Sequence, residues 1–287
     1  MCEPLDFSEN RDAAGLTRRH FTVLGAGAAL AGCAASGGVP GGSDLTERMV
    51  SISTQDGTCD AFFVYPAKGT HPGVVMWPDI AGLREAKKVM ARSLAARGYA
   101  VLVVNQYYRS SPSPVMESFA EWRTPEGQAL IAPMRAALTP EAIMRDGKAY
   151  VDFLDGQDSV AKDRKIGSNG YCMGGPFTVR TAAAAPDRVG AAASFHGAGL
   201  VTGEADSPDK LLAKTDAAYL FAIARNDDEK QPEQKTALRE SSAKAGRPAE
   251  IEVYAADHGW CVPDSPAWDP DEADRAFKRM LALFEKL

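Results

Sequence analysis

The chain alternates between short apolar runs and longer stretches with helical spacing. The apolar runs are nearly uninterrupted, which is typical of strands buried on both faces of a parallel sheet. They comprise residues 74–77, 100–104, 189–195 and 219–224, and residues 249–254 predict a further strand. Helical patterns comprise residues 84–97, 140–154, 173–185, 229–245 and 270–287. The order strand, helix, strand predicts an α/β fold with a mainly parallel sheet and right-handed crossovers.

Two segments depart from this alternation. Residues 50–65 alternate apolar and polar positions around the turn dipeptide Asp56-Gly57, which predicts two antiparallel strands. Residues 105–139 form a long irregular excursion after a strand. Such excursions often contact substrate in α/β proteins, although a surface helix pair without a functional role is the alternative.

The first residues have the layout of an export signal. Arg18 and Arg19 precede the apolar run 23–31, which suggests the twin-arginine route. The run is much shorter than the roughly 20 residues that span a bilayer, so we expect no stable transmembrane span. We therefore expect an export signal at 1–33, a linker at 34–49, one domain at 50–287, and a periplasmic or envelope-associated location.

Cys33 raises the question of a lipid anchor. Residues 30–33, Leu-Ala-Gly-Cys, resemble a lipoprotein cleavage box in which Cys33 receives the lipid. The alternative is a small-residue cleavage site beside which Cys33 is incidental. The sequence leaves both open.

Composition narrows the choice of partners. The net charge is -6, and no run of basic residues occurs, which argues against a nucleic-acid partner. A hydrophobic content of 45% with 24% charged residues is ordinary for a globular protein. We expect a small-molecule substrate, and neither a cofactor nor a metal ion.

Residues 165–176, KIGSNGYCMGGP, predict a strand, a sharp turn and a helix. Gly170-x-Cys172-x-Gly174 follows the nucleophile-elbow pattern, in which the residues two before and two after the nucleophile are small. A thiol at a helix N-terminus is stabilised as thiolate, and the amide of Met173 would face a developing oxyanion. The alternative is a buried structural cysteine in an ordinary glycine-rich turn.

The residues that would activate this thiol follow in the chain. In elbow enzymes the nucleophile, acid and base come in that order, each after a strand. Here Cys172 is followed by Asp227 or Asp228 after one strand, and by His258 after the last one. His196 also ends a strand and could line the pocket, but no suitable acid follows it, so His258 is the preferred base.

The remaining cysteines of the body are Cys59 and Cys261. A bridge between them is conceivable in an oxidising compartment, but two cysteines form no disulfide framework and we do not expect one. Cys172 would then be unpaired, as a nucleophile requires.

Five ordered motifs carry a resemblance to a known family. They are PDIAGL at 78–83, GYCMGG at 170–175, SFHGAGLV at 194–201, ARND at 224–227 and DHGW at 257–260. Over about residues 50–287 the chain resembles the dienelactone hydrolases (carboxymethylenebutenolidases), α/β-hydrolases with a Cys-Asp-His triad and helices on both faces of the sheet.

The resemblance implies a role for each matching residue. Cys172 would be the nucleophile, Asp227 the acid and His258 the base, with the amides of Met173 and Ile80 as the oxyanion hole. The implied activity is hydrolysis of a small ester or lactone through a thioester. A thioesterase or acyl transferase on the same fold, or a non-catalytic envelope binding protein, are the alternatives.

Two positions depart from the family pattern. Where the family has a glutamate that pairs with the resting thiol, this chain has Asp79, one methylene shorter. Where the family's substrate-binding arginine follows the histidine, this chain has Val262. The second difference weakens the expectation of a dienelactone substrate more than that of hydrolysis.

Four further residues are candidates for contact with the substrate. Arg109 and Arg123, in the excursion, would supply a positive charge, although a surface arginine is the default for either. His196 and Trp260 belong to the family motifs near the base.

Overall fold

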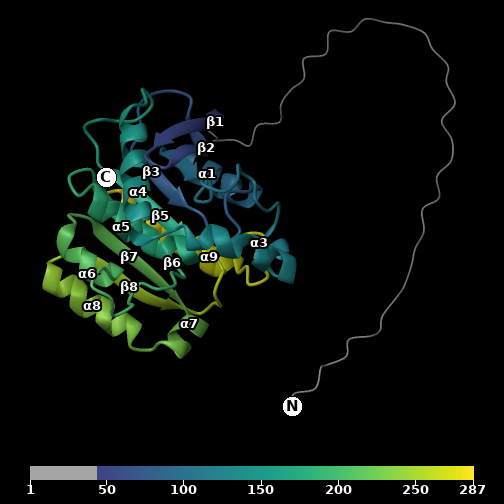
Figure 1. Cartoon of the computed structure of the whole chain (residues 1–287). Helices are drawn as coiled ribbons and strands as arrows, with labels where there is room; N and C mark the ends of the chain where they lie inside the picture. Colours follow the sequence, from purple (N-terminus) through teal and green to yellow (C-terminus); the bar gives the residue numbers. More distant parts are fainter. Residues whose placement is uncertain (1–43) are drawn as a thin grey trace, which may run out of the picture. The chain divides into compact units, whose positions relative to one another are not determined.

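The computed structural model describes residues 44–287, whose eight strands form one sheet (Figure 1). The strands are β1 Leu45–Thr54, β2 Gly57–Pro66, β3 Gly73–Trp77, β4 Ala100–Val104, β5 Ile166–Tyr171, β6 Val189–Phe195, β7 Ala218–Ala224 and β8 Ala249–Tyr254. Their order is β1-β2-β4-β3-β5-β6-β7-β8. β1, β2 and β4 pair antiparallel, and every pair from β4 to β8 is parallel.

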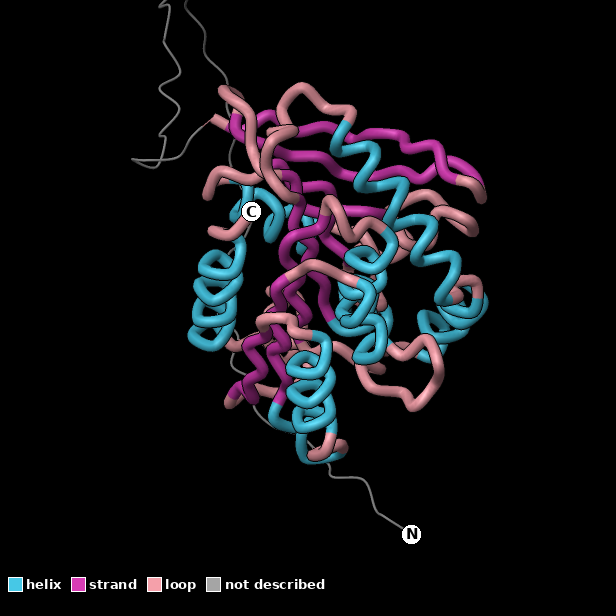
Figure 2. The backbone as a smooth tube through the Cα atoms, turned by 90° about the vertical axis from the view of Figure 1, so that its left-hand side faces the viewer, coloured by secondary structure: helices cyan, strands magenta, loops and turns pink. Residues whose placement is uncertain are grey.

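Helices cover both faces of this sheet, as Figure 2 shows. α1 (Glu85–Ala95) and α9 (Pro270–Phe284) pack on one face, while α4 (Pro140–Asp155), α5 (Gly175–Ala184) and α8 (Gln234–Ala245) pack on the other. The shorter helices are α2 Phe119–Trp122, α3 Pro125–Ala136, η1 Cys172–Gly174, α6 Pro208–Leu211, η2 Leu212–Lys214 and α7 Arg225–Lys230. The predicted α/β fold is confirmed.

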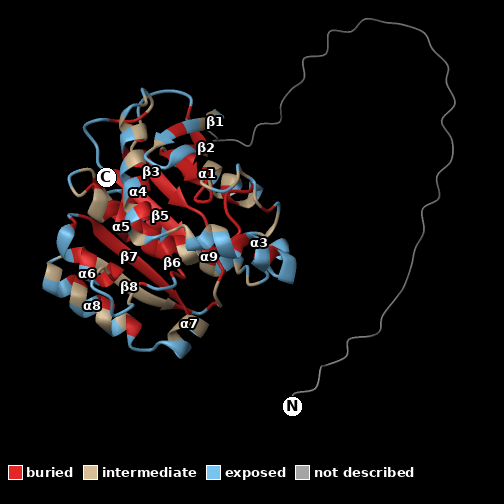
Figure 3. Cartoon of the chain, viewed as in Figure 1, coloured by how far each residue is buried: buried red, intermediate tan, exposed pale blue. Residues whose placement is uncertain are grey.

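The core consists of one large apolar cluster on each face of the sheet (Figure 3). All residues of β3, β4 and β5 are buried, as their apolar and small side chains predict. Cys59 belongs to the cluster beside α4, and Cys261 belongs to the cluster beside α1 and α9. Because the sheet separates them, they cannot form a bridge, and both thiols are free.

The structure differs from the sequence-based prediction in three segments. β1 begins at Leu45, inside the segment predicted as linker, because residues 45–49 pair with β2. The irregular excursion contains α2 and α3, which pack with Ile80 and Tyr107 beside the site described below. The helix predicted at 229–245 is divided into α7, which begins at Arg225, and α8, which begins at Gln234.

The predicted export signal and Cys33 lie outside the described residues. Within residues 44–287, none of the helices has both the length and the hydrophobicity needed to cross a bilayer.

Candidate active site

Cys172 lies at the corner between β5 and η1, with a φ of 54°. This left-handed conformation costs free energy for a residue other than glycine, so the surrounding structure must enforce it. The flanking glycines allow the close approach. A Cβ on Gly170 would lie 2.1 Å from the carbonyl oxygen of Gly174, and one on Gly174 would lie 2.5 Å from the carbonyl oxygen of Pro78. The sequence pattern thus forms a true elbow.

His196, at the end of neighbouring β6, holds this corner. The Cys172 amide donates a hydrogen bond of 3.0 Å to Nδ1 of His196, which itself has a φ of 41°. The ring is buried, and burial together with the nearby charges of His258 and Lys87 holds the pKa of His196 well below its ordinary value. His196 is therefore neutral, with Nδ1 as acceptor. It lies under the site rather than on its accessible surface.

His258 and Asp227 form the second half of the site. Nδ1 of His258 lies 2.6 Å from Oδ2 of Asp227 at the start of α7, and the backbone amide of His258 donates to Oδ1 of Asn226 over 2.9 Å. Asp228, the alternative acid, is bound by Lys235 at 2.6 Å. The structure thus brings His258 to Asp227 and directs Asp228 elsewhere.

Cys172 lies close enough to His258 to influence its pKa. Burial alone would lower the pKa of His258, but the hydrogen bond with Asp227 and the proximity of Cys172 raise it to about 10. The imidazole is therefore protonated at neutral pH, and its charge faces the thiol.

The loop after β3 carries Ile80, whose amide is a candidate oxyanion donor. Several hydrogen bonds fix this loop. The hydroxyl of Tyr107 donates to the Ile80 carbonyl over 2.8 Å, and the Gln106 side chain donates to the Asp79 carbonyl over 2.7 Å. Ile80 and Met173 pack in the same apolar cluster. At a helix start, the Met173 amide has no intrahelical acceptor.

Asp79 does not pair with the thiol. Its buried carboxylate accepts a hydrogen bond of 2.8 Å from Arg84 and lies 2.9 Å from Nζ of Lys87. Arg84 also bridges to Asp264, 2.7 Å away. Burial would raise the pKa of Asp79, but the charges of Lys87 and Arg84 hold it well below its usual range. Asp79 thus departs from the family's glutamate, as its shorter side chain suggested, and instead anchors the loop after β3 that carries Ile80.

Residues 59–287 match the model of the dienelactone hydrolase family. The chain belongs to this family. Membership of the dienelactone hydrolase family makes the chain a hydrolase, in agreement with the resemblance carried by its motifs.

Individual relatives are distant but cover most of the chain. A Methylorubrum extorquens protein named after carboxymethylenebutenolidase is 25% identical over 249 residues, which cover 84% of this chain and 81% of the relative. The carboxymethylenebutenolidase of Pseudomonas putida is 29% identical over 157 residues, which cover 54% of this chain and 63% of the relative. A dienelactone hydrolase-like promiscuous phosphotriesterase from metagenomic libraries has a TM-score of 0.67 at 23% identity, covering 85% of this chain and 98% of that one.

Two candidates for substrate contact in this dienelactone hydrolase family member have structural roles instead. Arg109 forms ion pairs of 2.8 Å with buried Asp146 and 2.6 Å with Asp56, so its charge is already compensated. Trp260 is fully buried and stacks on Tyr254, with ring centroids 5.1 Å apart. Trp260 is therefore inaccessible to a substrate, and the Arg109 guanidinium is already paired.

Arg123, the remaining charged candidate, is exposed at the end of α2, and its role stays a prediction. Among residues 44–287 no group of three His, Cys, Asp or Glu side chains is arranged to hold a metal ion.

Sequence reasoning missed the residues that hold the site in place. Asn226 positions the His258 backbone, and Arg84 joins the oxyanion loop to Asp264 beyond the base. Arg84 and Lys87, three positions apart at the start of a helix that follows the PDIAGL motif, were the available signal. Because two basic residues at this spacing usually lie on a solvated helix face, the pattern did not predict that they are buried and paired with Asp79.

Proposed function

We propose that this dienelactone hydrolase family member cleaves a small ester or lactone with Cys172 as nucleophile, through a thioester intermediate. The observation that carries the proposal is the hydrogen bond between His258 and Asp227, beside the elbow that presents Cys172. Each of these residues follows a different strand, so the sheet itself sets their separation. This arrangement supports a role for His258 as an oriented base for the nucleophile.

The first half of the reaction forms the thioester. The Cys172 thiolate attacks the carbonyl carbon, and the resulting oxyanion accepts hydrogen bonds from the amides of Met173 and Ile80. The carbon–oxygen bond then breaks, and protonated His258 gives its proton to the leaving alkoxide. In a lactone, the released hydroxyl stays attached to the acyl group.

The second half of the reaction releases the acid. Neutral His258 takes a proton from water, and the hydroxide adds to the thioester carbonyl. The carbon–sulfur bond breaks, which returns the Cys172 thiolate, protonated His258 and the carboxylic acid. Asp227 stabilises the imidazolium and fixes which nitrogen faces the thiol.

We propose that the preferred substrate is uncharged. Val262 replaces the family's arginine and is buried, and Arg109 is held by Asp146 and Asp56. In the buried cluster under the oxyanion loop, the two carboxylates of Asp79 and Asp264 balance the two cations. These cations therefore offer little attraction to a substrate carboxylate.

The test is hydrolysis of p-nitrophenyl acetate and of a cis-dienelactone by the wild type and by Cys172→Ala. We expect activity that disappears in Cys172→Ala, with the neutral ester preferred. Asp227→Asn should lose most activity, while the matched variant Asp228→Asn should keep it. Wild-type rates in Cys172→Ala would refute the assigned nucleophile, and a preference for the dienelactone would refute the uncharged substrate.

We further propose that residues 1–33 direct export. The support is the arginine pair Arg18-Arg19 before a short apolar run. Replacing both arginines by lysine should leave the precursor in the cytoplasm, and the mass of the mature N-terminus would show whether Cys33 carries lipid. Unchanged secretion of the double variant would contradict this route.

A further inference from the structure

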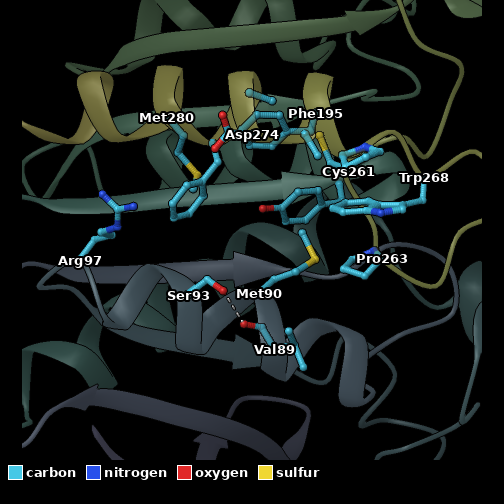
Figure 4. Close-up of a pocket in the computed structure, with 15 residues that line it drawn as sticks. Val89, Met90, Ser93, Arg97, Phe195, Cys261, Pro263, Trp268, Asp274 and Met280 are labelled. Carbon is cyan, nitrogen blue, oxygen red and sulfur yellow. Dashed lines mark hydrogen bonds between the residues drawn. The ribbon is translucent and has the colours of Figure 1, made fainter. Parts of the chain in front are cut away.

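A cavity of about 620 Å³ lies between α1 and α9, on one face of the sheet. Figure 4 shows its lining, which includes none of the residues Cys172, Asp227 or His258. Its volume falls within the range of about 300–1,000 Å³ found for small-molecule sites. The cavity is thus distinct from the proposed active site.

The lining of the cavity is largely apolar, and its two ends differ in chemistry. Met90, Phe277 and Met280 line it, and Arg97 and Trp268 stand at opposite ends in Figure 4. Trp268 is 40% exposed although it is a large apolar side chain. A chain-like apolar group would cover this surface along its length.

The charge at one end of the cavity indicates which polar group a ligand would carry there. Arg97 takes part in none of the ion pairs formed by residues 44–287, and its guanidinium lies 5.9 Å from the Phe277 ring centroid. Asp274, the acidic residue of the lining, is bound by Lys278 at 2.6 Å. The charge left without a partner at this cavity is therefore positive, which matches a carboxylate.

We propose that the cavity is a second binding site, for an unbranched medium-chain carboxylate of about ten carbons. The carboxylate lies against Arg97, and the chain extends over Met90 and Met280 towards Trp268. The site does not depend on the proposed catalytic activity.

Two aromatic rings of the lining separate this cavity from the proposed active site. The rings of Tyr171 and Phe195 stack there, with centroids 5.2 Å apart and planes at 17°. The residues that follow them are Cys172 and His196, which bond to each other on the other side of the corner. A ligand in the cavity is therefore separated from Cys172 by this pair of rings.

The test is calorimetric titration of the folded protein with decanoate and with decanol. Decanoate should bind the wild type and weaken about fivefold in Arg97→Gln, the range expected for one partly exposed ion pair. Decanol should bind both proteins equally. The control Arg239→Gln, which removes an exposed arginine of α8 on the opposite face of the sheet, should bind decanoate as the wild type does.

Two further measurements locate the ligand. Ser93 is an exposed residue of the lining whose hydroxyl bonds only to its own helix, so Ser93→Phe should fold and should abolish binding of both compounds. Alkylation of Cys172 should leave decanoate binding unchanged. The proposal is overturned if decanoate does not bind, if Arg97→Gln binds it as well as the wild type, or if alkylation blocks it.

Discussion

The backbone amide of Cys172 donates its hydrogen bond to the side chain of His196, 3.0 Å away on the next strand. In the described chain these are the two residues other than glycine with positive φ, 54° and 41°. Two strained corners on adjacent strands thus support each other. The acceptor nitrogen must be unprotonated, which the buried position of His196 ensures.

Replacing His196 by phenylalanine should disturb the elbow while keeping a ring in place. The Cys172 amide would lose its acceptor, and a buried unpaired N–H costs about 1–3 kcal/mol. We expect lower kcat for p-nitrophenyl acetate with little change in KM, and reduced stability in urea. His196→Asn, which retains an acceptor oxygen, should recover part of kcat. A control, His71→Phe, changes a ring that contacts only the Lys68 carbonyl and should have no effect on kcat.

The His258–Asp227 pair should make stability depend on pH. Because the folded-state pKa of His258 is raised to about 10, the native state holds a proton that the unfolded state releases above about pH 6.5. Stability should therefore fall as pH rises from about 6.5 to 10. Urea unfolding at pH 7, 8, 9 and 10 would measure this slope. Asp227→Asn should flatten it, whereas Asp228→Asn should not, and equal slopes in both variants would contradict the assignment.

Arg84→Met should be strongly destabilising. The change leaves the carboxylates of Asp79 and Asp264 without their shared partner, and breaking a buried ion pair costs about 3–5 kcal/mol. Arg92→Met on the same helix breaks only exposed pairs with Glu47 and Glu85, worth about 0–1 kcal/mol. Urea unfolding would compare the two. A similar loss in both would mean that the buried cluster does not anchor the oxyanion loop.

Gly174→Ala should prevent normal packing of the elbow. Its Cβ would lie 2.5 Å and 2.6 Å from the carbonyl oxygens of Pro78 and Trp77, which are backbone atoms and cannot move aside cheaply. We expect a loss of at least about 1–3 kcal/mol, the usual cost of overpacking. At Gly156 the nearest atom is 3.3 Å away, so Gly156→Ala should change the melting temperature little. Comparable melting of Gly174→Ala and wild type would be the contrary result.

The sequence pattern predicted the central strands closely. β4 and β6 occupy the predicted residues, since continuous apolar runs between turns leave few alternatives. The start of α7 was not predicted because the residues of this helix, RNDDEK, have no apolar periodicity, and its position is set by hydrogen bonds to the loop after β8.

Side-chain partners were harder to predict than strands. Arg109 was interpreted as a substrate contact because its partners, Asp56 and Asp146, are 53 and 37 positions away in the chain. Asp79 was compared with a glutamate that pairs with the thiol, but Arg84 and Lys87 hold it instead. Pairings that depend on tertiary contacts leave no periodic trace in a sequence.

The strand order also determines which part of the site unfolds first on heating. β8 lies at the edge of the sheet and pairs only with β7, and most of its residues are half-buried. The loop after β8 carries His258, while β5, which carries the nucleophile, is central and wholly buried. Edge strands open before central ones. The base should therefore leave the thiol while most of the sheet is still intact, and hydrolytic activity should be lost at a lower temperature than the secondary structure.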